Sequence, residues 1–168
     1  QFQLFFQDAL QYIDREKQKR SIYLKEHNIS GKDIDLLLKI TFDLTYKDFE
    51  YLIKFLLDKD KYISIDVSKS CQYQDYHWND IVAEKENNKY YYQCKQWKNE
   101  YVHLKKLWEY YATIFHTKKN NPNAVFTYIT TSYIKDDLSK EFLKDNHIKY
   151  IDHKELISWC KRFHLDQE

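Results

Sequence analysis

Glycine, proline and methionine are nearly missing from this chain. Its 168 residues include one glycine, one proline and no methionine. The scarcity of the first two leaves few residues that break helices, and no low-complexity tract or internal repeat is visible. Because the sequence begins at Gln1 and contains no methionine, we expect it to be a domain of a longer protein.

Cysteine is also rare. Cys71, Cys94 and Cys160 are widely spaced and odd in number, which argues against a disulfide framework and against a zinc site. This use of cysteine predicts an intracellular location, in the cytoplasm or nucleoid, or in the nucleus of a eukaryotic cell.

Long apolar runs are absent as well. No stretch approaches the roughly 20 consecutive apolar residues of a membrane-spanning helix. Residues 2–7 form a short segment, interrupted by polar residues and without a basic leader, so they do not resemble a signal peptide. We therefore expect no membrane association.

Neither sign of charge predominates. The chain has 27 basic and 26 acidic residues, which gives a formal net charge of +1. A protein that binds DNA alone usually has a strongly basic surface. The balance instead fits a catalytic module that depends on a second copy of the chain or on further domains for binding.

Apolar and aromatic residues, in contrast, are plentiful. They make up 43% and 18% of the chain, enough for one substantial core. Their spacing predicts an N-terminal helical extension over residues 1–44 and a single domain over residues 45–168. The predicted helices cover 2–27, 33–40, a segment after Thr45, 100–117, 134–146 and 153–163, and the predicted strands cover 62–67, 79–84, 90–95, 124–129 and 148–151.

The most informative segment is a hairpin near the middle of the chain. Two strand-like segments flank a polar turn, and we expect Asn87-Asn88 to form a two-residue loop. In that register Asp80 faces Lys95, and Val82 faces Gln93.

The two faces of this hairpin differ in polarity. Side chains alternate across a strand, so Gln93 and Lys95 share one face. A carboxylate, an amide oxygen and a lysine on that face could hold Mg²⁺ and orient a water beside a phosphate. The alternative is an exposed polar edge with an aspartate–lysine cross-strand pair. The opposite face is apolar enough to be buried and carries Ile81, Ala83, Tyr92 and Cys94.

A helix is predicted directly before the first strand. Thr45 has the residue type and position of an N-cap, and apolar residues then recur at helical spacing. Glu50 borders the buried face of this helix. It either points toward a cleft or is exposed to solvent in the first turn, and the sequence leaves both readings open.

Several motifs occur in the order and spacing of a known family. They are YKDFEYLI at residues 46–53, Asp80, QCKQW at residues 93–97, FTYITT at residues 126–131 and IKYIDHKEL at residues 148–156. Together they resemble the catalytic domain of Mrr-like type IV restriction endonucleases, a branch of the PD-(D/E)xK nuclease superfamily. The resemblance extends roughly from Thr45 to Trp159. It implies an α/β restriction-endonuclease-like fold, in which helices flank a central mixed sheet with an αβββαβ core.

The resemblance also implies an activity and a site. The implied activity is hydrolysis of DNA phosphodiester bonds by an Mg²⁺-dependent endonuclease, with Mn²⁺ able to substitute, in a larger defence or DNA-processing protein. Asp80 matches the main metal-binding carboxylate, and Gln93 matches a second ligand that binds through its amide oxygen. Lys95 matches the catalytic lysine, Glu50 the glutamate that completes the site, and the Cys94 carbonyl a further metal ligand.

The chain departs from the family before the motif aspartate, where a glycine-rich stretch is usual. Residues 72–79 are rich in aromatics instead, although glycine would permit a closer approach of backbone to phosphate. We expect Tyr76 and Trp78 in this stretch to contact nucleic acid, with Lys98 as a third contact. The departure and the balanced charge keep a second function open, that of a non-catalytic nuclease-like module that binds nucleic acid or a protein partner.

Most other aromatic residues are expected to be buried. Trp108, Tyr111 and Trp159 fall on apolar helical faces, which is typical of core residues.

Overall fold

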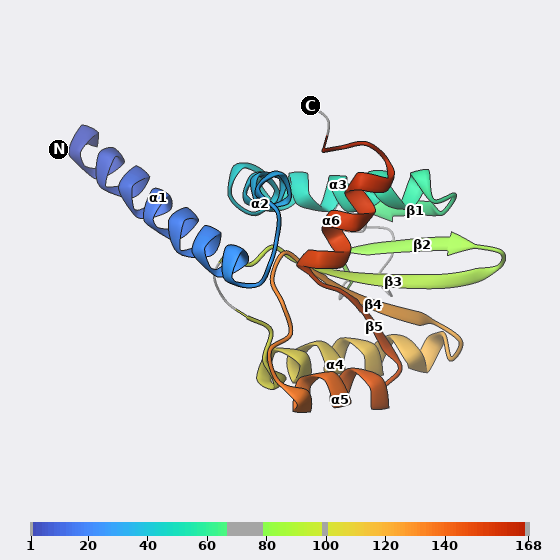
Figure 1. Ribbon diagram of the computed structural model, residues 1–168. Helices are drawn as coiled ribbons and strands as arrows, with labels where there is room; N and C mark the ends of the chain where they lie inside the picture. The colour runs from blue at the N-terminus through green and yellow to red at the C-terminus, as the bar shows by residue number, and fades with distance from the viewer. Residues whose placement is uncertain (1, 67–78, 99–100, 167–168) are drawn as a thin grey trace.

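A five-stranded mixed sheet forms the centre of the protein (Figure 1). The computed structural model describes residues 2–66, 79–98 and 101–166. The helices are α1 (Phe2–Glu26), α2 (Gly31–Leu38), a π-helical turn η1 (Lys39–Asp43), α3 (Tyr46–Lys59), α4 (Leu104–Asn120), α5 (Asp137–Asp145) and α6 (His153–Arg162). The strands are β1 (Ile63–Asp66), β2 (Ile81–Lys85), β3 (Asn88–Lys95), β4 (Val125–Thr130) and β5 (Ile148–Ile151).

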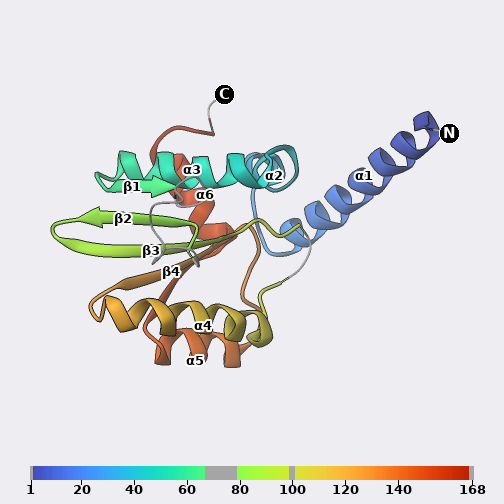
Figure 2. The same ribbon diagram turned by 180° about the vertical axis from the view of Figure 1, so that it is seen from behind.

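The strands are ordered β1-β2-β3-β4-β5. The first three pair antiparallel, whereas β4 pairs parallel with both β3 and β5. Helices α3 and α6 lie on one side of the sheet, and α4 and α5 lie on the other (Figures 1 and 2). The α/β fold with an αβββαβ core, predicted from the motifs, is confirmed.

Each side of the sheet has its own hydrophobic core. The first core lies under α3 and α6 and includes Phe49, Ile53, Ile81, Cys94 and Leu156. The second core lies under α4 and α5 and includes Val82, Tyr91, Leu107, Phe126 and Ile148.

Strand β3 contributes to both cores. Tyr92 and Cys94 are buried in the first core, and Tyr91 is buried in the second. This alternation follows from the pleat of the strand. It confirms the apolar face that the sequence predicted for the hairpin.

The hairpin turn lies one residue earlier than predicted. Lys85 pairs with Asn88, so Glu86 and Asn87 form the two-residue loop, with φ values of 52° and 64°. Positive φ at both central residues is typical of the type I′ turn that joins twisted strands. The predicted pairing is therefore wrong, since Val82 faces Tyr91 instead of Gln93. A shift of two residues in the pairing leaves every side chain on its predicted face.

Two helices on the second core differ from their prediction. Val102 bridges to Ile134 in a short parallel contact, so α4 begins after it and α5 does not include Ile134. On α4, Trp108 is 54% exposed and Phe115 is 57% exposed, so the prediction that Trp108 lies in the core is wrong. Trp159 of α6 is buried, as predicted.

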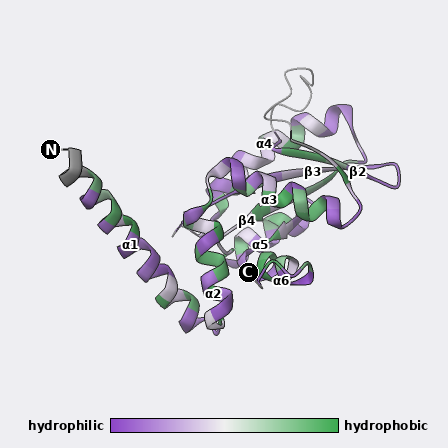
Figure 3. Ribbon diagram, turned by 90° about the horizontal axis from the view of Figure 1, so that it is seen from above, coloured by the Kyte–Doolittle hydropathy of each residue, from purple (hydrophilic) through white to green (hydrophobic). Residues whose placement is uncertain are grey.

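The N-terminal helices pack against the body of the protein at one end only. Helix α1 extends away from the sheet, and hydrophobic and hydrophilic residues alternate along it (Figure 3). Near its C-terminal end the buried Arg20 guanidinium donates to the Thr131 carbonyl at 2.8 Å. Leu24, Leu37 and Ile157 form a small apolar cluster that joins α1 and α2 to α6. No helix within the described ranges has the length and apolar character needed to cross a bilayer.

Four helices in the described part of the chain end at a left-handed residue that is not glycine. Asn28 follows α1 with φ 60°. Lys61 follows α3 with φ 69°, His147 follows α5 with φ 54°, and His164 follows α6 with φ 60°. Glycine is the usual residue at this position because it lacks a Cβ atom.

The start of α3 is fixed by a capping box. Thr45 Oγ1 accepts from the Asp48 N–H at 3.1 Å, and Asp48 Oδ2 accepts from the Thr45 N–H at 3.4 Å. We expect Thr45→Ala to lower the free energy of unfolding by about 1 kcal/mol in urea denaturation, because the helix loses this cap. Lys47→Ala, an exposed change in the same turn, is the control. Equal midpoints for Thr45→Ala and wild type would contradict the role of the cap.

Candidate active site

The candidate site lies where β2 and β3 separate. Asp80 immediately precedes β2, and its backbone N–H donates to the Tyr92 carbonyl at 3.0 Å. Beyond this point the Cys94 N–H donates to Asp80 Oδ2 at 2.7 Å. The carboxylate oxygen therefore accepts the hydrogen bond that a carbonyl of the neighbouring strand would otherwise accept. The backbone of β3 holds the Asp80 side chain in place through this bond.

Tyr46 joins this arrangement from the first turn of α3. Its hydroxyl lies 2.7 Å from the Cys94 carbonyl oxygen and 3.2 Å from Asp80 Oδ2. Burial, followed by the charge of Asp80, raises the pKa of Tyr46 far above its usual value, so the hydroxyl stays protonated and donates. The sequence analysis missed Tyr46. Its position four residues before Glu50 on the same helical face is the signal that could have found it.

Glu50 is buried beside the same group of atoms. Glu50 is only 3% exposed, and the charge of its carboxylate is among the causes that raise the pKa of Tyr46. Of the two readings of Glu50 that the sequence left open, solvent exposure is wrong. The helix brings this carboxylate to the side of the site occupied by Tyr46 and Asp80.

Gln93 and Lys95 approach from the other side of the sheet. They line a cavity of about 330 Å³ together with Trp97, Lys106, Glu109, Tyr110, Thr113 and Tyr128. Gln93 Oε1 is buried there without a hydrogen-bond partner, and so are the hydroxyls of Tyr110 and Tyr128. Within the described ranges, the Lys95 ammonium has no ion pair or hydrogen bond.

The negative charge of Asp80 affects two tyrosines that line this cavity. Burial first, and then the charge of Asp80, raises the pKa of Tyr110 well above its usual value. Burial also raises the pKa of Tyr128, with smaller contributions from Glu109 and Asp80. The two sides of the site therefore meet at Asp80, and both tyrosine hydroxyls remain hydrogen-bond donors.

The oxygen atoms at this point suit a hard divalent cation. The set comprises the carboxylates of Asp80 and Glu50, the Gln93 amide oxygen and the Cys94 carbonyl, which are the ligand types that Mg²⁺ prefers. The unpartnered Gln93 Oε1 is the observation that tests the fit, because a buried acceptor needs a partner. The Cys94 thiol lies in the first core and is not available. In the part of the chain that the structure covers, there is no cluster of three or more His, Cys, Asp or Glu side chains, so any cation here depends on the neutral oxygens as well.

Comparison with known proteins places this chain in a family. Residues 42–160 match the model of the Mrr catalytic domain, which is described as a restriction endonuclease. The chain belongs to the Mrr restriction endonuclease family. No curated protein shows significant sequence similarity to it.

Two solved structures are similar to this Mrr domain. MspJI restriction endonuclease, solved in complex with a 27-mer oligonucleotide, has a TM-score of 0.54 and 12% identity over 83% of this chain. AF1548, a protein of unknown function, has a TM-score of 0.49 and 16% identity over 61% of this chain. The Mrr domain spans 34% of the MspJI chain and 55% of the AF1548 chain.

The predicted nucleic-acid contacts lie at the edge of what the structure covers. Tyr76 and Trp78 lie outside the described residues. Lys98 is exposed just beyond β3, with its ammonium 5.9 Å from the ring centre of Phe42. Its contact with nucleic acid stays a prediction.

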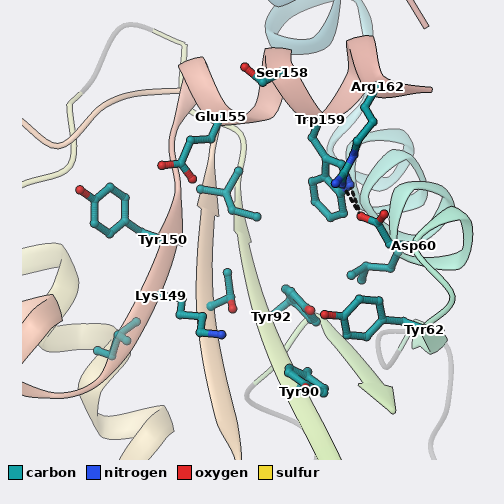
Figure 4. A pocket seen from close by; sticks show the side chains of 14 residues that line it. Asp60, Tyr62, Tyr90, Tyr92, Lys149, Tyr150, Glu155, Ser158, Trp159 and Arg162 are labelled. Atoms are coloured by element: carbon teal, nitrogen blue, oxygen red, sulfur yellow. Dashed lines mark hydrogen bonds and ion pairs between the residues drawn. The ribbon is translucent and has the colours of Figure 1, made fainter. Parts of the chain in front are cut away.

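A further cavity is separate from the site. It measures about 750 Å³ and lies on the first-core side of the sheet, between the end of α3 and α6 (Figure 4). Trp159 Nε1 and the Arg162 guanidinium both donate to Asp60 at 2.6 Å on its wall. None of the predicted site residues that the structure describes lines it.

Gln96 connects the site to the N-terminal part of the Mrr domain. Its amide nitrogen lies 2.8 Å from each of the carbonyls of Ile40 and Leu44, which precede α3. We expect Gln96→Leu to lower the free energy of unfolding by about 2 kcal/mol, because two hydrogen bonds are lost and two carbonyls are left without a donor. Urea denaturation measures the change. Gln11→Leu, at an exposed position of α1, is the matched control. If both changes lowered the free energy of unfolding equally, the two hydrogen bonds of Gln96 would not stabilise the protein.

Proposed function

We propose that this chain is an Mg²⁺-dependent endonuclease that hydrolyses DNA phosphodiester bonds. The single observation that carries the proposal is the buried, unpartnered Gln93 Oε1, which lies in a cavity that Lys95 also lines. The Asp80 carboxylate is hydrogen-bonded to Cys94, the residue of β3 that lies between these two. The oligonucleotide bound to MspJI supports DNA as the substrate. We further propose an intracellular location, as the nuclease module of a larger defence or DNA-processing protein.

The metal would be held by Asp80, Glu50, the Gln93 amide oxygen and the Cys94 carbonyl. When bound, Mg²⁺ would stabilise the negative charge that develops on the phosphate oxygens, and Mn²⁺ could take its place. Gln93 is a neutral amide at a position where many such nucleases have a carboxylate, so the site has one negative charge fewer. We therefore expect a millimolar metal requirement.

Lys95 acts on the substrate side of this arrangement. Its ammonium lies on the same face of β3 as Gln93 and has no competing carboxylate partner among the described residues. It orients the attacking water and neutralises charge on the phosphate in the transition state. The hydroxyls of Tyr110 and Tyr128 in the same cavity are donors that can meet phosphate oxygens.

Binding of DNA is proposed to need more than a single copy of this chain alone. Because the net charge is only +1, a homodimer or further domains would supply the basic surface.

Cleavage by wild type and by Lys95→Ala tests the proposed activity. We expect wild type to cut plasmid or single-stranded DNA in Mg²⁺ or Mn²⁺, and Lys95→Ala of equal thermal stability to cut at least about 100-fold more slowly. Lys119→Ala, at an exposed position at the end of α4, is the control. If neither wild type nor the variant cuts while both bind DNA equally, the chain is a non-catalytic nuclease-like binding module.

Metal affinity tests the role of Tyr46 separately from cleavage. The Tyr46 hydroxyl contacts both Asp80 and the Cys94 carbonyl, so a cation that takes these oxygens must displace it. We expect Tyr46→Phe to bind Mn²⁺ about fivefold more tightly in calorimetric titration, because one hydrogen bond no longer competes. Tyr12→Phe, on the exposed part of α1, should match wild type, and Asp80→Asn should abolish binding. Weaker binding by Tyr46→Phe would instead make the hydroxyl a support of the metal.

A further inference from the structure

A third cavity lies at the edge of the sheet where the parallel strands end. It measures about 390 Å³ and opens between the end of α1, the segment after β4 and the start of α6. Its walls include Tyr23, Tyr133 and His153. Tyr23 and Tyr133 stack with their ring centres 4.5 Å apart, which gives the cavity a firm aromatic side.

Positive charge surrounds this cavity. Lys135, Lys140 and Lys154 line it, and Asp152 is the one carboxylate among its lining residues. Asp152 Oδ1 accepts from the backbone N–H groups of Lys154 and Glu155, at 3.0 and 3.2 Å, so this carboxylate caps α6. Lys140 has a long contact of 4.0 Å with the exposed Asp137. The cavity therefore carries a net positive charge that suits an anion.

A buried nitrogen atom on the wall of the cavity has no partner. His153 is buried, and its Nδ1–H donates to the Ser132 carbonyl at 3.0 Å. Because Nδ1 carries the proton, His153 Nε2 is a hydrogen-bond acceptor, and it has no partner among the described residues. Buried polar atoms are seldom left unsatisfied, so a donor is expected at this wall, such as a water that also donates to a bound anion.

The cavity lies on the same edge of the sheet as Lys95. Strands β3, β4 and β5 run parallel, with Lys95 beside Thr130 and Ile129 beside Ile151. Neighbouring strands lie about 4.8 Å apart, so the ends of β3 and β5 are about 10 Å apart. A single nucleic-acid strand can therefore reach both places.

We propose that this cavity binds a phosphate group through Lys135 and Lys154. The source that we favour is the backbone of the nucleic acid whose cleavage is proposed above, and this choice of source rests on that proposed function. Free phosphate has the same chemistry and is the other source that the experiment separates.

The experiment compares two pairs of lysines of equal charge. Lys135→Gln with Lys154→Gln removes the two cations of the cavity. Lys119→Gln with Lys144→Gln removes two exposed cations at the C-terminal ends of α4 and α5, at the opposite edge of the sheet, and is the control. All assays contain EDTA, so DNA is not cut and the outcome is independent of nuclease activity.

The first arm measures binding of a short DNA duplex at several salt concentrations. We expect the cavity variant to reduce the slope of log K against log salt by about 1, the value for one phosphate contact, and the control to leave it unchanged. The second arm measures the rise in Tm that inorganic phosphate produces. We expect the cavity variant to lose this rise.

Each outcome decides the proposal. A reduced slope together with loss of the phosphate effect supports a strand phosphate, and loss of the phosphate effect alone supports free phosphate. If neither quantity changes, or if the control pair changes both equally, the cavity is not a phosphate site. Absence of cutting by wild type in metal would overturn the proposed nuclease and leave these binding results intact.

Discussion

The backbone N–H of Cys94 donates to the Asp80 carboxylate, and the rest of the site is arranged around this bond. The ladder between β2 and β3 ends just before it, and the carboxylate continues the pairing as a side-chain acceptor. Asp80 is thereby positioned by the backbone of β3. The Cys94 carbonyl on the same residue then receives Tyr46, which brings the first turn of α3 against the open end of the hairpin.

This geometry lets one strand present groups to two sides of the sheet. The pleat of β3 sends Cys94 into the first core and directs Gln93 and Lys95 toward α4. Glu50 comes from α3 on the first-core side. The candidate ligands therefore converge from both layers only where the sheet ends, and a change in either core would move one half of the site relative to the other.

Period-two alternation was enough to predict the faces of the hairpin, and the Thr45 cap was enough to predict α3. The position of the turn was not predictable in the same way. Asn87 and Asn88 both tolerate positive φ, and nothing in the sequence favours Glu86-Asn87 over Asn87-Asn88 as the two loop residues. Trp108 shows a second limit. Helical spacing places it on an apolar stripe, yet the second core is too narrow to cover the whole stripe and leaves it at the surface. Tyr46 joins the site by a tertiary contact with Asp80 and Cys94, and the only local sign of it is its place one helical turn before Glu50.

The left-handed residues that end four helices bear on how the chain can be encoded. They are Asn28, Lys61, His147 and His164, and they occupy backbone positions where glycine is usual. The one glycine of the chain, Gly31, stands at the start of α2 instead. Each such residue retains a Cβ atom in a conformation that disfavours it by roughly 1 kcal/mol or more. The fold forms these turns without glycine. A gene poor in G and C, in which the GG-initial codons of glycine and the CC-initial codons of proline are scarce, can therefore specify this architecture.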